Sequence, residues 1–112
     1  MSALGDFLHE QRKIARLTLR QLGERAGVSH TYLGEIERGD AEKPSNDVLE
    51  RIANALPGVH WVTLDALTRG VPLDDAIRLA DIHQIMETLQ PDAQENLRQY
   101  ARFLRDSKPK AP

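Results

Sequence analysis

The sequence predicts an all-α protein of five short helices followed by a C-terminal two-helix hairpin. Apolar residues recur at spacings of three and four along most of the chain, which is the period of an amphipathic helix. No stretch alternates apolar and polar residues for long enough to predict a strand. Cap residues and glycines divide the periodic segments, so the helices are short.

The first two helices are predicted from an apolar stripe and a cap. Leu4, Phe7 and Leu8 share one face of a helix near the start of the chain. A second helix begins at Thr18, because Thr18 and Gln21 stand at the spacing of a capping box.

The second and third helices are joined by a turn of only three residues. Gly27 can adopt the positive φ that such a sharp corner requires. Ser29 caps a helix that runs to about Arg38 and ends at Gly39. Two helices joined by a corner of this kind form a helix-turn-helix.

Two more helices are predicted before the hairpin. One opens after Ser45 and ends at Leu56, and a short one runs from Thr63 to Thr68. Trp61 is expected to cover these two helices as part of the core.

Beyond residue 70 the chain changes in character. Residues 71–90 contain one arginine and four acidic residues on an amphipathic segment, and a last helix starts at Pro91. The predicted organisation is a five-helix domain with the helix-turn-helix over 1–70, a C-terminal helical segment over 71–106 and a disordered tail over 107–112.

Composition excludes several classes of protein. The chain has 112 residues, a formal net charge of −2 and no cysteine, so disulfides, thiol nucleophiles and thiolate metal sites are excluded. No apolar run is long enough to span a bilayer and no signal peptide is visible, so we expect a cytoplasmic protein with no membrane partner. No catalytic spacing stands out, and His9 and His60 lack partners at ligand spacing. We therefore expect no enzyme, no cofactor and no metal.

The segment from Leu19 to Gly39 resembles the phage-repressor-like (Cro/Xre type) helix-turn-helix regulators. The likeness covers roughly residues 4–70 and implies a five-helix lambda-repressor-like DNA-binding domain. Gly23 stands where the family usually has a small alanine, which preserves close helix packing. The residues that carry the resemblance are Leu22, Ala26, Gly27, Val28, Leu33, Ile36 and the Ile-Glu-Arg-Gly ending.

The third helix carries the predicted base contacts. An α-helix fits the major groove of B-DNA, and Leu33 and Ile36 should point inward. The residues expected to contact bases are His30, Thr31, Tyr32 and Glu35, and those expected to contact phosphates are Arg12, Arg20, Gln21, Arg38 and Lys43. The alternative is that Glu35, Glu37 and Arg38 form an ordinary solvated helix face.

These residues predict a homodimeric, sequence-specific transcription regulator, more often a repressor in this family, bound to a palindromic operator on double-stranded DNA. The dimer contacts are expected from Leu97, Tyr100, Ala101, Phe103 and Leu104. Three alternatives stay open: the two apolar stripes of the hairpin cover each other, Phe103 packs on the chain's own fifth helix, or an antitoxin-like or adaptor protein uses its acidic hairpin to bind a protein partner. Titration of His30 would in addition make DNA binding sensitive to pH.

Overall fold

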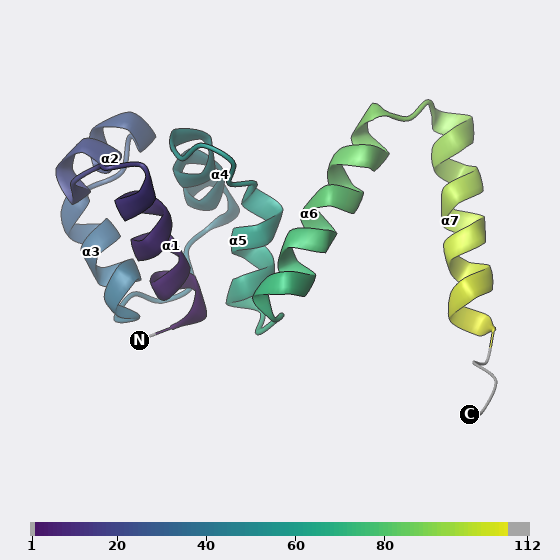
Figure 1. Ribbon diagram of the computed structural model, residues 1–112, viewed down its shortest axis with the longest axis horizontal. Helices are drawn as coiled ribbons and strands as arrows, with labels where there is room; N and C mark the ends of the chain where they lie inside the picture. Colours follow the sequence, from purple (N-terminus) through teal and green to yellow (C-terminus); the bar gives the residue numbers. More distant parts are fainter. Residues whose placement is uncertain (1, 108–112) are drawn as a thin grey trace. The chain divides into compact units, whose positions relative to one another are not determined.

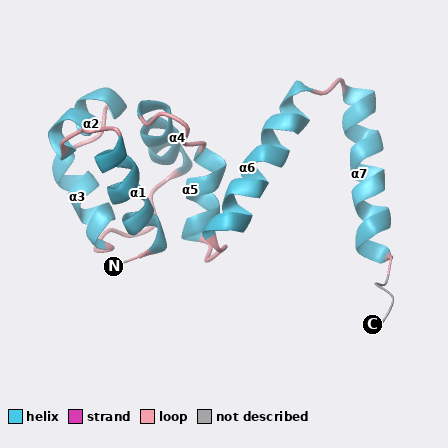
Figure 2. Ribbon diagram, viewed as in Figure 1, coloured by secondary structure: helices cyan, strands magenta, loops and turns pink. Residues whose placement is uncertain are grey.

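The computed structural model describes residues 2–107, and within this range it contains seven helices and no strand (Figures 1 and 2). The all-α fold class predicted from the sequence is confirmed. None of the described helices combines the length and the apolar composition that a membrane crossing needs. The helices are α1 (Ala3–Ile14), α2 (Leu19–Ala26), α3 (His30–Arg38), α4 (Asn46–Ala55), α5 (Trp61–Thr68), α6 (Leu73–Thr88) and α7 (Pro91–Asp106).

The first five helices pack around one apolar core. Helix α1 contacts α3 and α5, α2 contacts α3 and α4, and α4 contacts α5 (Figure 1). Burial of each large aliphatic side chain contributes about 1.5–3 kcal/mol, so this core is the main source of stability. The largest fully buried side chains are Leu8, Leu22, Leu33, Leu49, Ile52 and Leu64.

Side-chain caps fix where most of these helices begin. The hydroxyls of Thr18, Ser29 and Ser45 accept hydrogen bonds from backbone N–H groups three residues later, as the sequence predicted. The predicted start of the fifth helix at Thr63 is wrong by two residues. His60 Nδ1 accepts a hydrogen bond of 3.1 Å from the Val62 N–H, so the imidazole caps a helix that begins two residues earlier.

The chain divides into two compact units within α6, between Asp81 and Ile82. Ala76 and Ala80, on the first part of α6, are buried in the first unit. Residues 71–81 are therefore structurally part of the same unit as residues 1–70. The functional division between 1–70 and 71–106 remains a prediction.

The second unit consists of the rest of α6 and α7. Gln94 Nε2 donates hydrogen bonds to Met86 O (2.7 Å) and Leu89 O (3.1 Å), which ties the turn to the start of α7. Helix α7 contains no buried residue, so its apolar stripe is not covered within this unit. Ser107 follows α7, and the rest of the predicted disordered tail lies outside the described residues.

Candidate nucleic-acid interface

The corner between α2 and α3 is built from local hydrogen bonds. Thr18 Oγ1 accepts from the Gln21 N–H at 3.0 Å, and Gln21 Oε1 accepts from the Thr18 N–H at 2.9 Å. Gly27 has a φ of 69°, in the left-handed region, and the Val28 N–H donates to Gly23 O. The predicted three-residue turn is confirmed.

Gly23 sets the distance between α2 and the start of α3. A Cβ atom at this position would lie 2.6 Å from Val28 O and 3.2 Å from the His30 nitrogen. Both neighbours are backbone atoms that cannot move without opening the turn. The position therefore excludes even alanine, and the N-terminal end of α3 is fixed against α2.

Helix α3 turns one face to the core and the other to solvent. Leu33 and Ile36 are buried, and His30, Thr31 and Arg38 are exposed. Glu35 is half-exposed on the outer side. Tyr32 differs from these residues because its side chain is partly buried and packs against the core. The structure thus places His30, Thr31 and Glu35 on the outer side of one short helix.

The far end of α3 is held by α1 through a close backbone contact. A Cβ atom on Gly5 would lie 2.6 Å from Ile36 O, and it would come closer still to Glu37 O. Only glycine lets α1 approach the last turn of α3 this closely.

An ion pair reinforces the same contact between α1 and α3. Arg12 Nε and Nη2 donate to the two carboxylate oxygens of Glu37 at 2.7 and 3.0 Å, and His9 Nδ1 lies 2.8 Å from Glu37 Oε1. The Glu37 side chain is only 8% exposed. Burial alone would raise the pKa of Glu37, but the hydrogen bonds and charges of Arg12 and His9 lower it. The hydrogen bond to Glu37 raises the pKa of Arg12.

This network corrects two expectations. Glu37 is not part of a solvated face, because its carboxylate is turned toward α1. Arg12 was expected to contact a phosphate, but all three of its guanidinium nitrogens donate inside the protein, the third to Leu17 O at 2.9 Å. The Arg12 side chain therefore serves the contact between α1 and α3.

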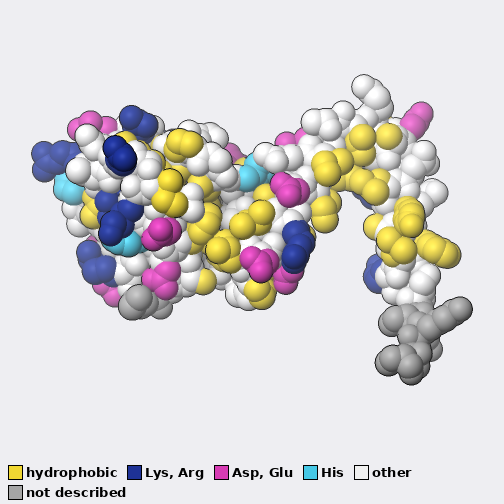
Figure 3. All heavy atoms as spheres, in the orientation of Figure 1, with side chains coloured by type: hydrophobic (Ala, Val, Ile, Leu, Met, Phe, Trp, Pro, Cys, Tyr) yellow, Lys and Arg dark blue, Asp and Glu magenta, His cyan; other side chains and the backbone are white. Residues whose placement is uncertain are grey.

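The other residues expected at phosphates lie on the surface around α3. Arg20 and Gln21 are exposed in the first turn of α2. The capping box uses the side-chain oxygen of Gln21 and not its nitrogen, so the amide N–H₂ group can still donate a hydrogen bond. Arg38 Nε donates to Asp40 Oδ2 at 3.2 Å, in a pair that is exposed on both sides. Most of the Lys and Arg side chains visible on this side of the first unit lie over α1 to α3 (Figure 3).

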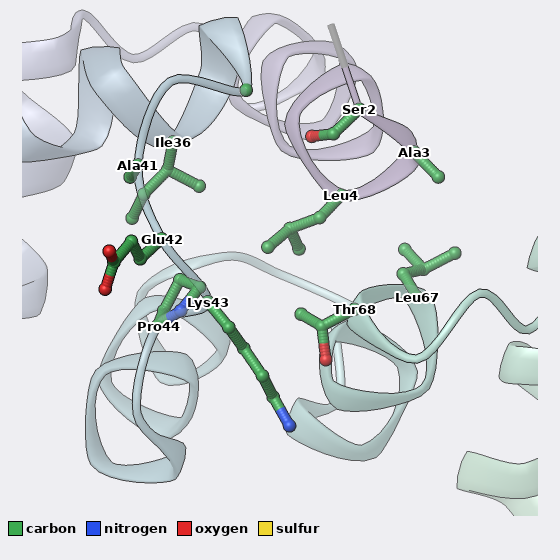
Figure 4. Close-up of a pocket in the computed structure, with 11 residues that line it drawn as sticks. Ser2, Ala3, Leu4, Ile36, Ala41, Glu42, Lys43, Pro44, Leu67 and Thr68 are labelled. Carbon is green, nitrogen blue, oxygen red and sulfur yellow. The ribbon is translucent and has the colours of Figure 1, made fainter.

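Lys43 takes a different direction from the others. It lines a pocket formed by the start of α1, the loop after α3 and the end of α5, and its side chain extends toward α5 (Figure 4). Its Nζ lies 3.8 Å from Asp65 Oδ1. A contact this long at a half-exposed lysine contributes little energy, so the side chain is weakly held.

The close approach at Gly5 and the partners of Glu37 were not predicted from the sequence. A glycine inside an apolar-periodic helix signals a close backbone approach, and His9 and Arg12 stand at a spacing of three on one face of α1. Neither signal identifies the helix that is approached. That information depends on the tertiary arrangement.

The residues expected to make the dimer contact lie together on α7. Leu97, Tyr100 and Leu104 are 38%, 55% and 56% exposed, and Phe103 is 68% exposed. The rings of Tyr100 and Phe103 meet edge to face, with centroids 6.4 Å apart. Hydrophobic side chains are visible on the surface of α7 in Figure 3.

Two known proteins each resemble about half of this chain. The uncharacterized HTH-type transcriptional regulator Rv0474 of Mycobacterium tuberculosis is 54% identical over 52 residues, which are 46% of this chain and 36% of that protein. The transcriptional regulator ClgR of the same species is 45% identical over 53 residues, 47% of this chain and 46% of that protein. The matched parts thus span less than half of either relative.

The similarity extends to a solved structure and to a protein family. The SinR protein/SinI protein complex aligns with 93% of this chain and 99% of that chain, at a TM-score of 0.53 and 24% identity, which is a likeness of fold. Residues 3–67, more than half of the chain, match the family described as the helix-turn-helix domain. The chain therefore belongs to the helix-turn-helix domain family.

Proposed function

We propose that this protein is a sequence-specific DNA-binding transcription regulator that acts as a homodimer. The observation that carries the proposal is the outward face of α3, where His30, Thr31 and Glu35 stand clear of the core on a helix held at both ends. A helix presented in this way enters the major groove of B-DNA and contacts base edges there. The relatives named as transcriptional regulators support the same function.

Within this proposal the surface residues have separate roles. Glu35 accepts a hydrogen bond from a cytosine amino group, and Thr31 and His30 contact neighbouring bases. Arg20, Gln21 and Arg38 bind phosphates and fix the position of the protein on the duplex. Two copies bind a palindromic operator with their α3 helices about 34 Å apart, and the bound dimer represses by blocking polymerase.

Selection of bound DNA from a random pool tests the proposal directly. At low salt we expect an enriched motif with two inverted half-sites about one helical turn apart. Affinity for that motif should fall steeply as salt is raised, because binding releases counterions from the phosphates. A pool that yields no enriched sequence would contradict the proposed function.

Replacing Glu35 with glutamine should change sequence preference more than overall affinity. The loss of the carboxylate should weaken discrimination at one base pair of each half-site by about 1–3 kcal/mol, because an amide can donate as well as accept. Binding to operators that carry each of the four bases at that position measures the effect. A control variant, Glu50→Gln, changes an exposed glutamate on α4 and should leave the preference unchanged.

Replacing Arg38 with alanine should have the opposite pattern. Affinity should fall by a similar factor for every DNA sequence, and the slope of log K against log salt should decrease by about one, because one phosphate contact is lost. Titrations with the selected operator and with a scrambled duplex at several salt concentrations measure both quantities. A loss confined to the selected operator would show that Arg38 contacts a base instead.

A protein partner is the second candidate function, as for an antitoxin-like or adaptor protein. Helix α6 begins with Asp74 and Asp75 and exposes Ile77, Ile82 and Ile85, so it offers acidic and apolar side chains together. This candidate predicts that a basic protein is retained by the full chain in a pull-down and lost when Asp74 and Asp75 become asparagines. Recovery of the chain alone favours the homodimeric regulator.

A further inference from the structure

Helix α7 carries an apolar stripe that needs a partner. Leu97, Tyr100 and Leu104 follow one another at spacings of three and four, and no residue of the helix is buried. An isolated helix of this length is marginally stable in water, because most helical stability in proteins comes from packing an apolar face. The exposed stripe is therefore an interaction surface.

A complementary surface lies on the first unit, where α1, α5 and the start of α6 meet. These elements form a groove of about 520 Å³. The apolar surface continues along α1 to Ile14, which is 66% exposed, and along α6 to Ile77, which is 44% exposed. The apolar residues that line the groove are Ala3, Phe7, Leu67, Val71, Pro72 and Leu73.

The charges at the two surfaces are opposite in sign. Asp6 and Glu10 stand one helical turn apart on the rim of the groove, and neither forms an ion pair with a described residue. Residues 97–105 of α7 contain three arginines and no acid. Arg98 and Arg102 are also one turn apart, beside the apolar stripe. The two acids on α1 and the two arginines on α7 are therefore each about 6 Å apart along their helices.

We propose that α7 of one copy docks in the α1–α5–α6 groove of a second copy, with Arg98 and Arg102 against Glu10 and Asp6. The inference rests on the homodimer proposed above and identifies the surface that α7 binds. A two-fold axis makes the contact reciprocal, so each dimer contains it twice. The apolar stripe from residue 97 to 104 is about 10 Å long, and the groove from residue 3 to 11 is about 12 Å long, so the two surfaces match in length.

Direct pairing of α7 with α7 fits the charges less well. It would bring Arg98 and Arg102 of both copies into one interface, where their positive charges repel, whereas the groove offers the carboxylates of Asp6 and Glu10. The present partner of Arg98 and Arg102 is Glu95 on the same helix, at 3.6 and 3.7 Å in exposed pairs that contribute little. Docking in the groove also places the dimer contact on α1, the helix that holds the end of α3.

A charge exchange in the full-length protein tests the contact. The double change Asp6→Arg and Glu10→Arg should raise the dimer dissociation constant at least about tenfold, because two attractions become repulsions. Adding Arg98→Glu and Arg102→Glu should restore the constant to within about threefold of the original. Sedimentation equilibrium gives these constants, and circular dichroism verifies that each variant is folded. Glu50→Arg, on an exposed part of α4, is the matched control and should leave dimerisation unchanged.

The failures of the two proposals are distinguishable in this experiment. A protein that stays monomeric at all concentrations lacks the proposed dimer altogether, and the docking contact is then wrong with it. A dimer that is unaffected by the reversal, or that the control weakens equally, overturns the groove contact and leaves the dimer in place. DNA selection on the same samples reports the regulator function separately.

Engineered disulfides identify which chain contributes α7. The protein has no cysteine, so only introduced residues can form a bridge. Gln11→Cys with Leu97→Cys, which face each other when Arg98 meets Glu10 and Arg102 meets Asp6, should join two chains under mild oxidation, as seen by mass on a non-reducing gel. A bridge within one chain would show docking in cis and overturn the proposal. Bridging by Leu97→Cys alone would show α7 pairing with α7 and would overturn it as well.

Discussion

Alanine at Gly5 should destabilise the protein more than any other single methyl group added to α1. The new Cβ would lie 2.6 Å from Ile36 O and closer to Glu37 O, and both acceptors belong to the backbone of α3. Because the two helices must move apart, the free energy of unfolding should fall by about 2 kcal/mol or more, even after the gain in helix propensity from alanine is included. Thermal unfolding should show a midpoint lowered by about 10 °C.

Gly34 provides the matched control for this change, because it is also a buried glycine inside a helix. Its added Cβ would lie 3.1 Å from Arg38 Nη1 and 3.6 Å from Leu19 Cδ1. The first neighbour is the end of an exposed, flexible side chain that can move into solvent. Gly34→Ala should therefore keep the stability or raise it by up to about 1 kcal/mol. Equal midpoints for the two variants would contradict the close packing of α1 on α3.

The helix boundaries could be predicted from the sequence because their causes are local. Thr18, Ser29 and Ser45 accept from N–H groups three residues away, and Gly27 and Gly39 end helices through their own φ angles. No information from the rest of the chain is needed for these features. The exception is α5, where a histidine nitrogen takes the place of the usual cap oxygen.

The outward face of α3 was likewise predictable, whereas the contacts that hold it were not. The positions of Leu33 and Ile36 fix which side is buried, and the helix period then gives the opposite side. Which helix meets Gly5, and which acid meets Arg12, depends on how α1 packs, and the partners are 25 or more residues apart in the sequence. Periodicity within one helix carries no information on such pairs.

The burial of α6 could not be predicted for a similar reason. Ala76 and Ala80 are small residues on a segment whose apolar stripe was assigned to a hairpin, but they are buried in the unit that ends at Asp81. Alanine is found both in cores and on surfaces, so an alanine in the sequence does not by itself predict burial. The packing of the first five helices decides that this part of α6 is covered.

Replacing Arg12 with methionine should have the second large effect, because it leaves the Glu37 carboxylate without its main partner. The Glu37 side chain is 8% exposed, and removal of one member of a buried pair costs about 3 kcal/mol. The Leu17 carbonyl also loses its donor. DNA affinity should fall at the same time, because the last turn of α3 is no longer fixed to α1.

The double variant Arg12→Met, Glu37→Gln separates the charge from the packing. It removes the unpaired carboxylate, so it should be more stable than Arg12→Met alone although it lacks the same ion pair. Denaturant titrations of the two single variants and the double variant give the coupling energy. If Arg12→Met and the double variant prove equally stable, the ion pair does not hold the two helices together.

The dependence of stability on pH provides an independent measurement of the same pair. The pKa of Glu37 is lower in the folded protein than its ordinary value of 4.5, so the unfolded state binds more protons in acid. The stabilisation from this group is therefore complete above pH 4.5 and is lost as the pH falls through the lowered pKa. Glu37→Gln lacks this contribution, so its unfolding free energy should fall less between neutral and acid pH than that of the unchanged protein. Parallel curves for the two proteins would mean that Glu37 is equally easy to protonate before and after folding, in contradiction to its contacts with Arg12 and His9.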